Sequence, residues 1–173
     1  MNYAIIKPND VANGPGIRVS LFVSGCTHHC KGCFNQEAWD FTYGSEFTQQ
    51  TIEQILTYLA PSYIKGLSLL GGEPFEYSNQ QGLLPLLREV KRRYPDKDIW
   101  CYSGYRFDED ILGQMCITHE VTKEMVSYLD VLVDGKFILE QKNINLRFRG
   151  SSNQRIIKVK ESLEANKIIL WED

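Results

Sequence analysis

The chain has 173 residues, of which 43% are hydrophobic and 24% are charged, and its formal net charge at pH 7 is −3. This is the composition of an ordinary globular protein rather than a disordered or fibrous one, and the length predicts one domain, residues 1–173. The slight acidic excess argues against a nucleic acid partner, because proteins that neutralise phosphates carry a basic excess.

No segment of the sequence has the features of an export signal or a membrane span. Residues 1–10 include Lys7 and Asp10 and lack an apolar stretch long enough for a signal peptide. No apolar run approaches the roughly 20 residues that cross a bilayer. We therefore expect a cytoplasmic protein without a membrane partner. In a reducing cytosol, five cysteines with three of them clustered indicate metal-binding or catalytic thiols rather than disulfides.

The first predicted strand leads directly into a loop that is rich in cysteine. Residues 13–18, with the sequence Asn-Gly-Pro-Gly-Ile-Arg, predict a tight turn because two glycines flank a proline. The apolar run Ile17–Val23 predicts a strand. Cys26, Cys30 and Cys33 follow it in a C-x3-C-x2-C spacing, so the thiols are expected on a loop at the end of a strand.

Helical and apolar segments alternate in the rest of the chain. Residues 34–47 show no clear period and are expected to connect elements, after which Thr48 can cap a helix that ends near Pro61. Further strands are predicted at residues 66–70, 99–102, 130–135, 156–159 and 168–171, and further helices at residues 79–94, 108–115 and 122–129. Pro85 is compatible with its helix only if it lies in the first turn.

The order of these elements predicts an α/β fold. Strands that alternate with helices, each ending in a glycine-rich or polar loop, are typical of parallel βα units. The strands are too few for a complete eight-stranded barrel, so we expect a partial (βα) barrel with mostly parallel strands. Ligands bind at the carboxyl ends of such strands. The cysteine loop, Gly71-Gly72-Glu73, Ser103-Gly104-Tyr105 and Asp134-Gly135 would all meet there.

The spacing of the three cysteines is the strongest chemical signal. Cys26, Cys30 and Cys33 can ligate three irons of a 4Fe-4S cluster, which takes four ligands, and the sequence has no fourth cysteine near them. One iron would then stay open for a chelating small molecule. No catalytic serine, histidine and aspartate set is evident, and none is needed where a cofactor carries the chemistry.

The cysteine motif followed by Gly71-Gly72-Glu73-Pro74 resembles the radical S-adenosylmethionine enzymes, and the resemblance implies one domain with the partial barrel of that family. Together with the cysteine segment, residues 13–18, 130–137 and 149–154 narrow the resemblance to the branch that activates the anaerobic ribonucleoside-triphosphate reductase. The similarity extends roughly from residue 13 to residue 155, although it assigns no contacts to residues 147–155.

This resemblance implies a reaction on a protein substrate. S-adenosylmethionine would chelate the open iron, and an electron from the reduced 4Fe-4S cluster would split it into methionine and a 5′-deoxyadenosyl radical. The radical would remove a hydrogen from a glycine near the C-terminus of the anaerobic ribonucleoside-triphosphate reductase and leave a glycyl radical there. The family also suggests flavodoxin as the electron donor.

The resemblance also implies roles for individual residues. The cluster ligands would be Cys26, Cys30 and Cys33. The segment near the adenine of S-adenosylmethionine would consist of Gly32, Cys33 and Phe34. The motif near its methionine amino group would consist of Gly71, Gly72 and Glu73. Glycines let a backbone come close to a ligand, and a carboxylate can balance an ammonium group.

One position departs from a common pattern. Glycyl-radical activases often have an aromatic residue just before the third cysteine, where this chain has Gly32. The departure favours the branch that activates the reductase over the branch that activates pyruvate formate-lyase. It also leaves Phe34 as the nearest aromatic candidate to pack against adenine.

Two other interpretations of the cysteine motif stay open. The chain could be another small radical S-adenosylmethionine enzyme, such as a pyruvate formate-lyase activase or a deazapurine synthase. His28 or His29 could instead complete a zinc site in a non-enzymatic interaction module, although zinc sites usually draw ligands from two separated pairs. We expect these histidines to be solvated loop residues or supporting donors. Cys101 and Cys116 are expected to be small buried hydrophobic residues.

Overall fold

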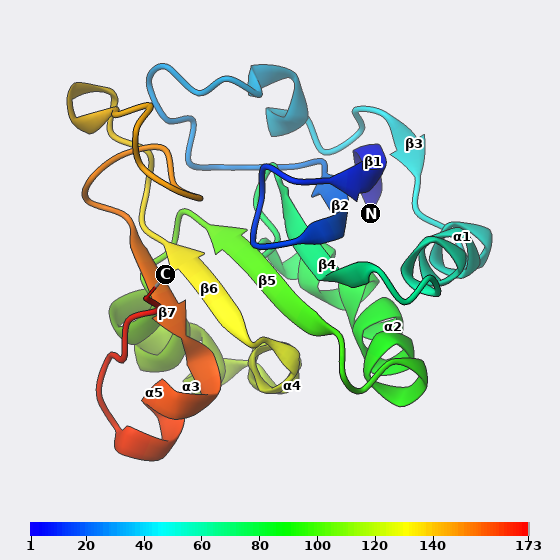
Figure 1. Ribbon diagram of the computed structural model, residues 1–173. Coiled ribbons are helices and arrows are strands. Elements are labelled where there is room, and N and C mark those ends of the chain that lie inside the picture. The colour runs from blue at the N-terminus through cyan, green and yellow to red at the C-terminus, as the bar shows by residue number, and fades with distance from the viewer. Residues whose placement is uncertain (173) are drawn as a thin grey trace.

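The computed structural model describes residues 1–172 as a mixed α/β protein with one seven-stranded sheet in the order β3-β1-β2-β4-β5-β6-β7 (Figure 1). The strands are β1 Asn2–Asp10, β2 Ile17–Val23, β3 Ser45–Glu46, β4 Ile64–Gly71, β5 Asp98–Ser103, β6 Val131–Asp134 and β7 Arg155–Lys158. The α-helices are α1 Gln49–Leu59, α2 Tyr77–Arg93, α3 Cys116–Thr118, α4 Glu120–Tyr128 and α5 Val159–Ala165. Two short 3-10 turns, η1 Gln36–Trp39 and η3 Leu139–Gln141, and a π-helix, η2 Phe107–Met115, complete the elements.

The four central strands confirm the α/β prediction. β2, β4, β5 and β6 run parallel to one another. Their residues are largely buried, as expected for strands with both faces covered. Figure 1 shows the segments that follow β2 and β6 running beyond the carboxyl ends of these strands, on the side away from α2 and α4.

The outer strands run antiparallel to their neighbours. β1 pairs with β2 and with β3 on one side of the sheet, and β7 pairs with β6 on the other. β1 is not predicted from the sequence, because its residues are mostly exposed or half-buried and lack the apolar run that marks a buried strand. The prediction of a strand at residues 168–171 is wrong, since only Leu170 forms a single bridge, to Ile157.

The helices differ in how well local patterns predicted them. α1 begins as predicted, because the Thr48 side chain accepts a hydrogen bond from the Thr51 N–H. The condition that Pro85 must lie in a first turn is not met, since α2 starts at Tyr77 and holds Pro85 in its interior. Such a proline costs about 3 kcal/mol. The buried leucines on either side of it offset that cost.

A π-helix replaces the α-helix predicted at residues 108–115. The Ile111 N–H donates to the Arg106 carbonyl, and the Cys116 N–H donates to the Ile111 carbonyl, each five residues back. No helix among residues 1–172 is long and apolar enough to cross a membrane.

Asp130 ties the start of β6 to three neighbouring elements. Its Oδ2 accepts from Lys91 Nζ at 2.9 Å and from the Ile99 N–H at 2.8 Å, and its Oδ1 accepts from Lys160 Nζ at 2.8 Å. Burial alone would raise the pKa of Asp130, but the bonds from Lys160, Lys91 and the Ile99 backbone outweigh it and lower the pKa.

We expect Asp130→Asn to lower the free energy of unfolding by about 1–2 kcal/mol at pH 7. Because the folded-state pKa lies below the unfolded value of about 3.9, this contribution is complete above that pH and is lost as the pH falls through the folded pKa. Urea unfolding at pH 7 and pH 3 should therefore show a smaller difference from the parent protein at pH 3. The exposed Asp96→Asn is the control, and an equal loss at both pH values would contradict the prediction.

Candidate functional site

A cavity of about 460 Å³ opens at the carboxyl ends of the parallel strands. Its volume falls within the range of about 300–1,000 Å³ that is usual for small-molecule sites. The residues that the sequence analysis selected all line this one cavity: Cys26, Cys30, Gly32, Cys33, Phe34, Gly71, Gly72 and Glu73. The fold therefore brings together two motifs that lie about 40 residues apart in the sequence.

The three cysteines are free thiols on one loop. Cys26 is buried, whereas Cys30 and Cys33 are half-buried. Burial raises the pKa of Cys26 to about 11. Burial also raises the pKa of Cys30. Because a metal binds the thiolate, loading a cluster here would release protons.

The donor set suits a cluster better than a single ion. Among residues 1–172, no three side chains of His, Cys, Asp and Glu lie in a group that could hold one metal ion. A 4Fe-4S cluster does not require such a group, because its cysteine thiolates bind different irons. Cys26, Cys30 and Cys33 meet that requirement as three thiols around one cavity.

Two glycines let the end of β4 lie directly against the start of the cysteine loop. A Cβ atom on Gly71, whose φ is +112°, would lie 2.5 Å from the Val23 backbone, and one on Gly72 would lie 2.5 Å from the Gly25 carbonyl oxygen. The Gly72 N–H donates to the Val23 carbonyl and the Glu73 N–H to the Gly25 carbonyl, both at 2.8 Å. The space left by the missing side chains is thus filled by the protein's own backbone.

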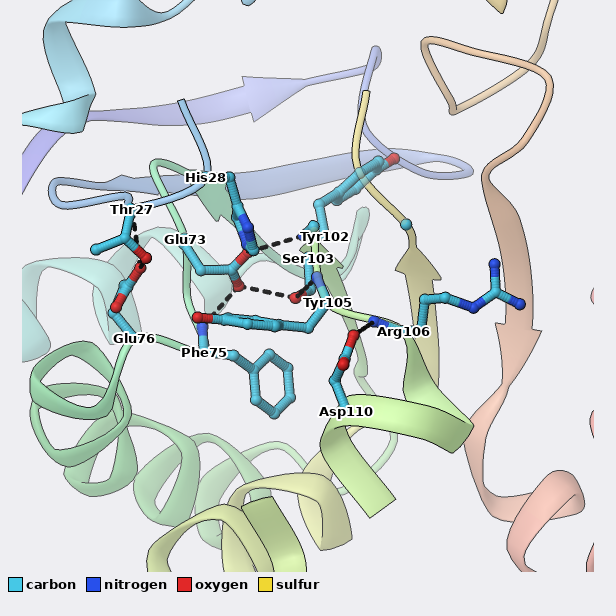
Figure 2. A network of polar contacts seen from close by, with 12 residues as sticks. Thr27, His28, Glu73, Phe75, Glu76, Tyr102, Ser103, Tyr105, Arg106 and Asp110 are labelled. Atoms are coloured by element: carbon cyan, nitrogen blue, oxygen red, sulfur yellow. Dashed lines mark hydrogen bonds and ion pairs between the residues drawn. The ribbon is translucent and has the colours of Figure 1, made fainter. Parts of the chain in front are cut away.

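Glu73 is the centre of a buried polar network (Figure 2). Its side chain is 1% exposed. One carboxylate oxygen accepts from the Phe75 N–H and from Ser103 Oγ, both at 2.8 Å. The other accepts from the Gly104 N–H at 2.7 Å and from His28 Nε2 at 2.8 Å. The carboxylate therefore joins the cysteine loop to the ends of β4 and β5, and its charge is held at the cavity wall.

His28 is the residue whose importance the sequence analysis missed. Its side chain is only 6% exposed, and its ring packs edge-on against Tyr105 at 4.4 Å between centroids. Of the two roles considered for the histidines, His28 takes that of a supporting donor. His29 instead stacks on Trp39 at 4.5 Å. Nothing in the local sequence distinguishes these two neighbours, because the partner of His28 lies 45 residues away.

The segment after β6 also forms part of the cavity wall. Gln154 Oε1 accepts from the N–H groups of Gly150 and Ser151 at 2.8 and 3.1 Å, and its Nε2 donates to the Gly135 carbonyl at 2.9 Å. Arg149 donates to the Gln154 carbonyl at 2.6 Å. These contacts of residues 149–154 with one another and with Gly135 shape the wall, a role that the sequence could not specify.

The Tyr102 hydroxyl is a polar group that the described residues leave without a hydrogen-bond partner, although it is buried. Burial raises the pKa of Tyr102, so the hydroxyl stays protonated and able to donate at neutral pH. Tyr102 also lines the cavity. A buried hydroxyl without a hydrogen-bond partner costs about 1–3 kcal/mol. A polar ligand in the cavity could accept a hydrogen bond from Tyr102 and remove that cost.

The remaining candidate residues make structural contacts. Cys101 is fully buried in the core, as predicted, whereas Cys116 is only half-buried. Asp134 accepts from Arg155 at 2.6 and 3.0 Å and from the Phe107 N–H at 2.8 Å. Asp134 therefore ties the end of β6 to β7 and η2.

Comparison with known proteins shows which family the chain resembles. Residues 12–157 match the family described as a 4Fe-4S single cluster domain. The chain is also similar to several proteins named anaerobic ribonucleoside-triphosphate reductase-activating protein. It is 47% identical to the one from Haemophilus influenzae over 162 residues, which cover 92% of this chain and 99% of that protein. It is 46% identical to the Vibrio cholerae protein, covering 90% of this chain and 97% of that one. It is 42% identical to the protein of Enterobacteria phage T4, covering 90% of this chain and 93% of that one.

Proposed function

Because the chain belongs to the family of anaerobic ribonucleoside-triphosphate reductase-activating proteins, we propose that it generates the glycyl radical of that reductase by cleaving S-adenosylmethionine at a 4Fe-4S cluster. The observation that carries this proposal is the shared cavity. Three thiols and the Gly71-Gly72-Glu73 motif line it together at the carboxyl ends of the parallel strands.

The residues of the cavity suit both groups. Cys26, Cys30 and Cys33 would hold three irons, and S-adenosylmethionine would bind beside Gly71-Gly72-Glu73 and the orphaned hydroxyl of Tyr102. When bound, the reduced cluster supplies the electron that splits the sulfonium into methionine and a 5′-deoxyadenosyl radical. The protein's part is to bind, orient and shield these groups rather than to transfer a proton.

Phe34 would pack against the adenine of S-adenosylmethionine. Its side chain lines the cavity but is 90% exposed, so it has room to cover a ligand. We expect Phe34→Ala to leave the stability unchanged and to raise the KM for S-adenosylmethionine about 3–10-fold, because an aromatic contact is worth about 0.5–1.5 kcal/mol.

Steady-state assay of deoxyadenosine measures this KM. The matched control is Tyr63→Ala, since Tyr63 is an exposed aromatic residue that does not line the cavity. An unchanged KM in Phe34→Ala would remove Phe34 from the adenine site.

The reductase would present its glycine to this cavity, and a flavodoxin would supply the electron. We place the protein in the cytoplasm, without a nucleic acid or membrane partner. We also infer that residues 1–173 form one domain with the partial barrel of radical S-adenosylmethionine enzymes. The four parallel strands and the cavity at their carboxyl ends support this last inference.

Anaerobic reconstitution with iron, sulfide, S-adenosylmethionine, a reductant and the reductase tests the proposal. We expect about four irons and four sulfides per chain, formation of 5′-deoxyadenosine, and a glycyl doublet on the reductase in electron paramagnetic resonance. Deoxyadenosine without the doublet would indicate another substrate, such as that of a pyruvate formate-lyase activase or a deazapurine synthase. Bound zinc without sulfide would favour an interaction module.

A further inference from the structure

The Glu73 carboxylate has no acceptor position left for a ligand. A carboxylate can accept about four hydrogen bonds, shared between its two oxygens. Oε1 accepts from the Phe75 N–H and from Ser103 Oγ, both at 2.8 Å. Oε2 accepts from the Gly104 N–H at 2.7 Å and from His28 Nε2 at 2.8 Å (Figure 2). Protein donors therefore fill the capacity of this side chain, which is only 1% exposed.

The four donors are themselves held in place. Those of Phe75 and Gly104 are backbone amides, whose direction is fixed by the path of the chain. Ser103 Oγ also accepts from the Tyr105 N–H at 3.0 Å. The His28 ring occupies the space that a side chain on Gly104 would take, 2.6 Å from the Cβ position, and packs edge-on against Tyr105 at 4.4 Å. A ligand that displaced one of these donors would leave it buried and unpaired, which is unfavourable.

The contacts of Glu73 hold the cysteine loop instead. His28 belongs to that loop, so its bond to the carboxylate ties the loop to the end of β5. The Glu73 N–H donates to the Gly25 carbonyl at 2.8 Å. Asn79 Nδ2 donates to the carbonyls of Ser24 and Glu73, both at 3.0 Å. The backbone and side chain of Glu73 thus fasten the chain on both sides of the first cysteine to the ends of β4 and β5.

We propose that Glu73 is a positioning residue that fixes the cysteine loop against the ends of β4 and β5 and does not bind the ammonium group of S-adenosylmethionine. This replaces the role expected from the sequence, in which the carboxylate balances that ammonium directly. The inference rests on the proposed function, because it takes S-adenosylmethionine as the ligand of the cavity.

The test compares the binding of two ligands to the reconstituted protein, with the cluster kept oxidised so that no cleavage occurs. One ligand is S-adenosylmethionine, and the other is its desamino analogue, in which hydrogen replaces the ammonium group. Equilibrium dialysis gives the Kd of each ligand, and the ratio of the two Kd values measures what the ammonium group contributes. A change that only alters the shape of the cavity affects both ligands and cancels in this ratio.

For Glu73→Gln we expect both Kd values to rise at least about 10-fold, the effect typical of residues that orient ligand-bearing segments, and their ratio to stay within about 2-fold of the parent. A direct contact would change the ratio about 10–150-fold, the value of a hydrogen bond to a charged group, and would overturn the inference. Parental Kd values would also overturn it, since Glu73 would then be merely structural. The control is Glu109→Gln, which alters an exposed carboxylate of η2 outside the cavity-lining residues.

Removal of a donor gives a second measurement, which decides if Glu73→Gln does not retain a cluster. His28→Ala leaves the carboxylate whole and frees one acceptor position. A positioning role predicts weaker binding of both ligands at a parental ratio, and His28→Gln, which keeps an N–H donor, should restore most of the binding. Stronger binding of S-adenosylmethionine relative to the analogue in His28→Ala would show that the carboxylate takes up the ammonium group, and would overturn the inference.

Hydrogen exchange of the cluster-free protein tests the positioning role without any ligand. The amides of Gly25, Cys26 and Thr27 are hydrogen-bonded. In Glu73→Gln they should exchange at least about 10-fold faster, while the amides of β4 keep their parental rates. Parental rates at these three amides would overturn the inference. Failure of the parent protein to bind or cleave S-adenosylmethionine would count against the proposed function alone, because the exchange measurement needs neither cluster nor ligand.

Discussion

Replacing Cys26, Cys30 or Cys33 by alanine, one at a time, is expected to reduce S-adenosylmethionine cleavage to the background rate. On the proposed assignment, each change would remove the only protein ligand of one iron, so a second iron would lose its anchor and the cluster would be released or rearrange. The effect should exceed the about 10–100-fold loss that follows removal of a residue that merely supports a ligand.

Iron and sulfide analysis and chromatography of 5′-deoxyadenosine measure the outcome. The matched control is Cys116→Ala, which removes a half-buried thiol from α3, outside the residues that line the cavity. Circular dichroism of the cluster-free variants should stay that of the parent, since the core does not depend on these thiols. Cleavage at the parental rate in any of the three variants would exclude that cysteine as a ligand.

Arg18→Ala is expected to cause the largest loss of stability, about 3–5 kcal/mol. Arg18 is fully buried, and its guanidinium forms an ion pair with Asp98 at 2.5 Å and donates to Ser68 Oγ at 2.8 Å and to the Leu67 carbonyl at 3.0 Å. Truncation leaves these acceptors without a donor and opens a void beside Trp100, whose ring centroid lies 5.6 Å from Arg18 Cζ. A domain is stable by only about 5–15 kcal/mol, so the loss would be a large fraction.

Urea unfolding of the cluster-free protein measures this loss. The control is Arg92→Ala, because Arg92 forms an exposed ion pair with Glu89 within one helix and should contribute little. Similar midpoints for the two variants would contradict the assignment of Arg18 as a buried structural cation.

Arg18 also explains the conformation of residues 13–18, for which the sequence predicted a tight turn. A Cβ atom on Gly14 would lie 2.8 Å from Arg18 Nε, and the Pro15 carbonyl accepts from the guanidinium at 3.2 Å. Ser68 Oγ donates to the Asn13 carbonyl at 2.6 Å. The turn at residues 13–18 therefore folds over its own arginine and places Asn13 at the cavity.

Features that depend on neighbours in the chain were determined by the sequence itself. The strand before Cys26, Cys30 and Cys33 predicted that these thiols lie on a loop at its end, and the Thr48 cap and the apolar periodicity of α1 predicted that helix. The alternation of strands and helices predicted the parallel centre of the sheet and hence the edge at which the motifs meet. These signals can be read locally because capping, periodicity and ligand spacing act over a few residues.

Only the tertiary structure decided the features whose partners lie far apart in sequence. The choice of His28 over His29 depends on Glu73, and the burial of Arg18 depends on Asp98, which lies on another strand. The half-buried strand β1 forms because it can pair with the edge of β2. α2 continues through Pro85 because the packing of the helix outweighs the low helix propensity of proline. In each case the energy comes from contacts across the fold, and no window of a few residues contains both partners.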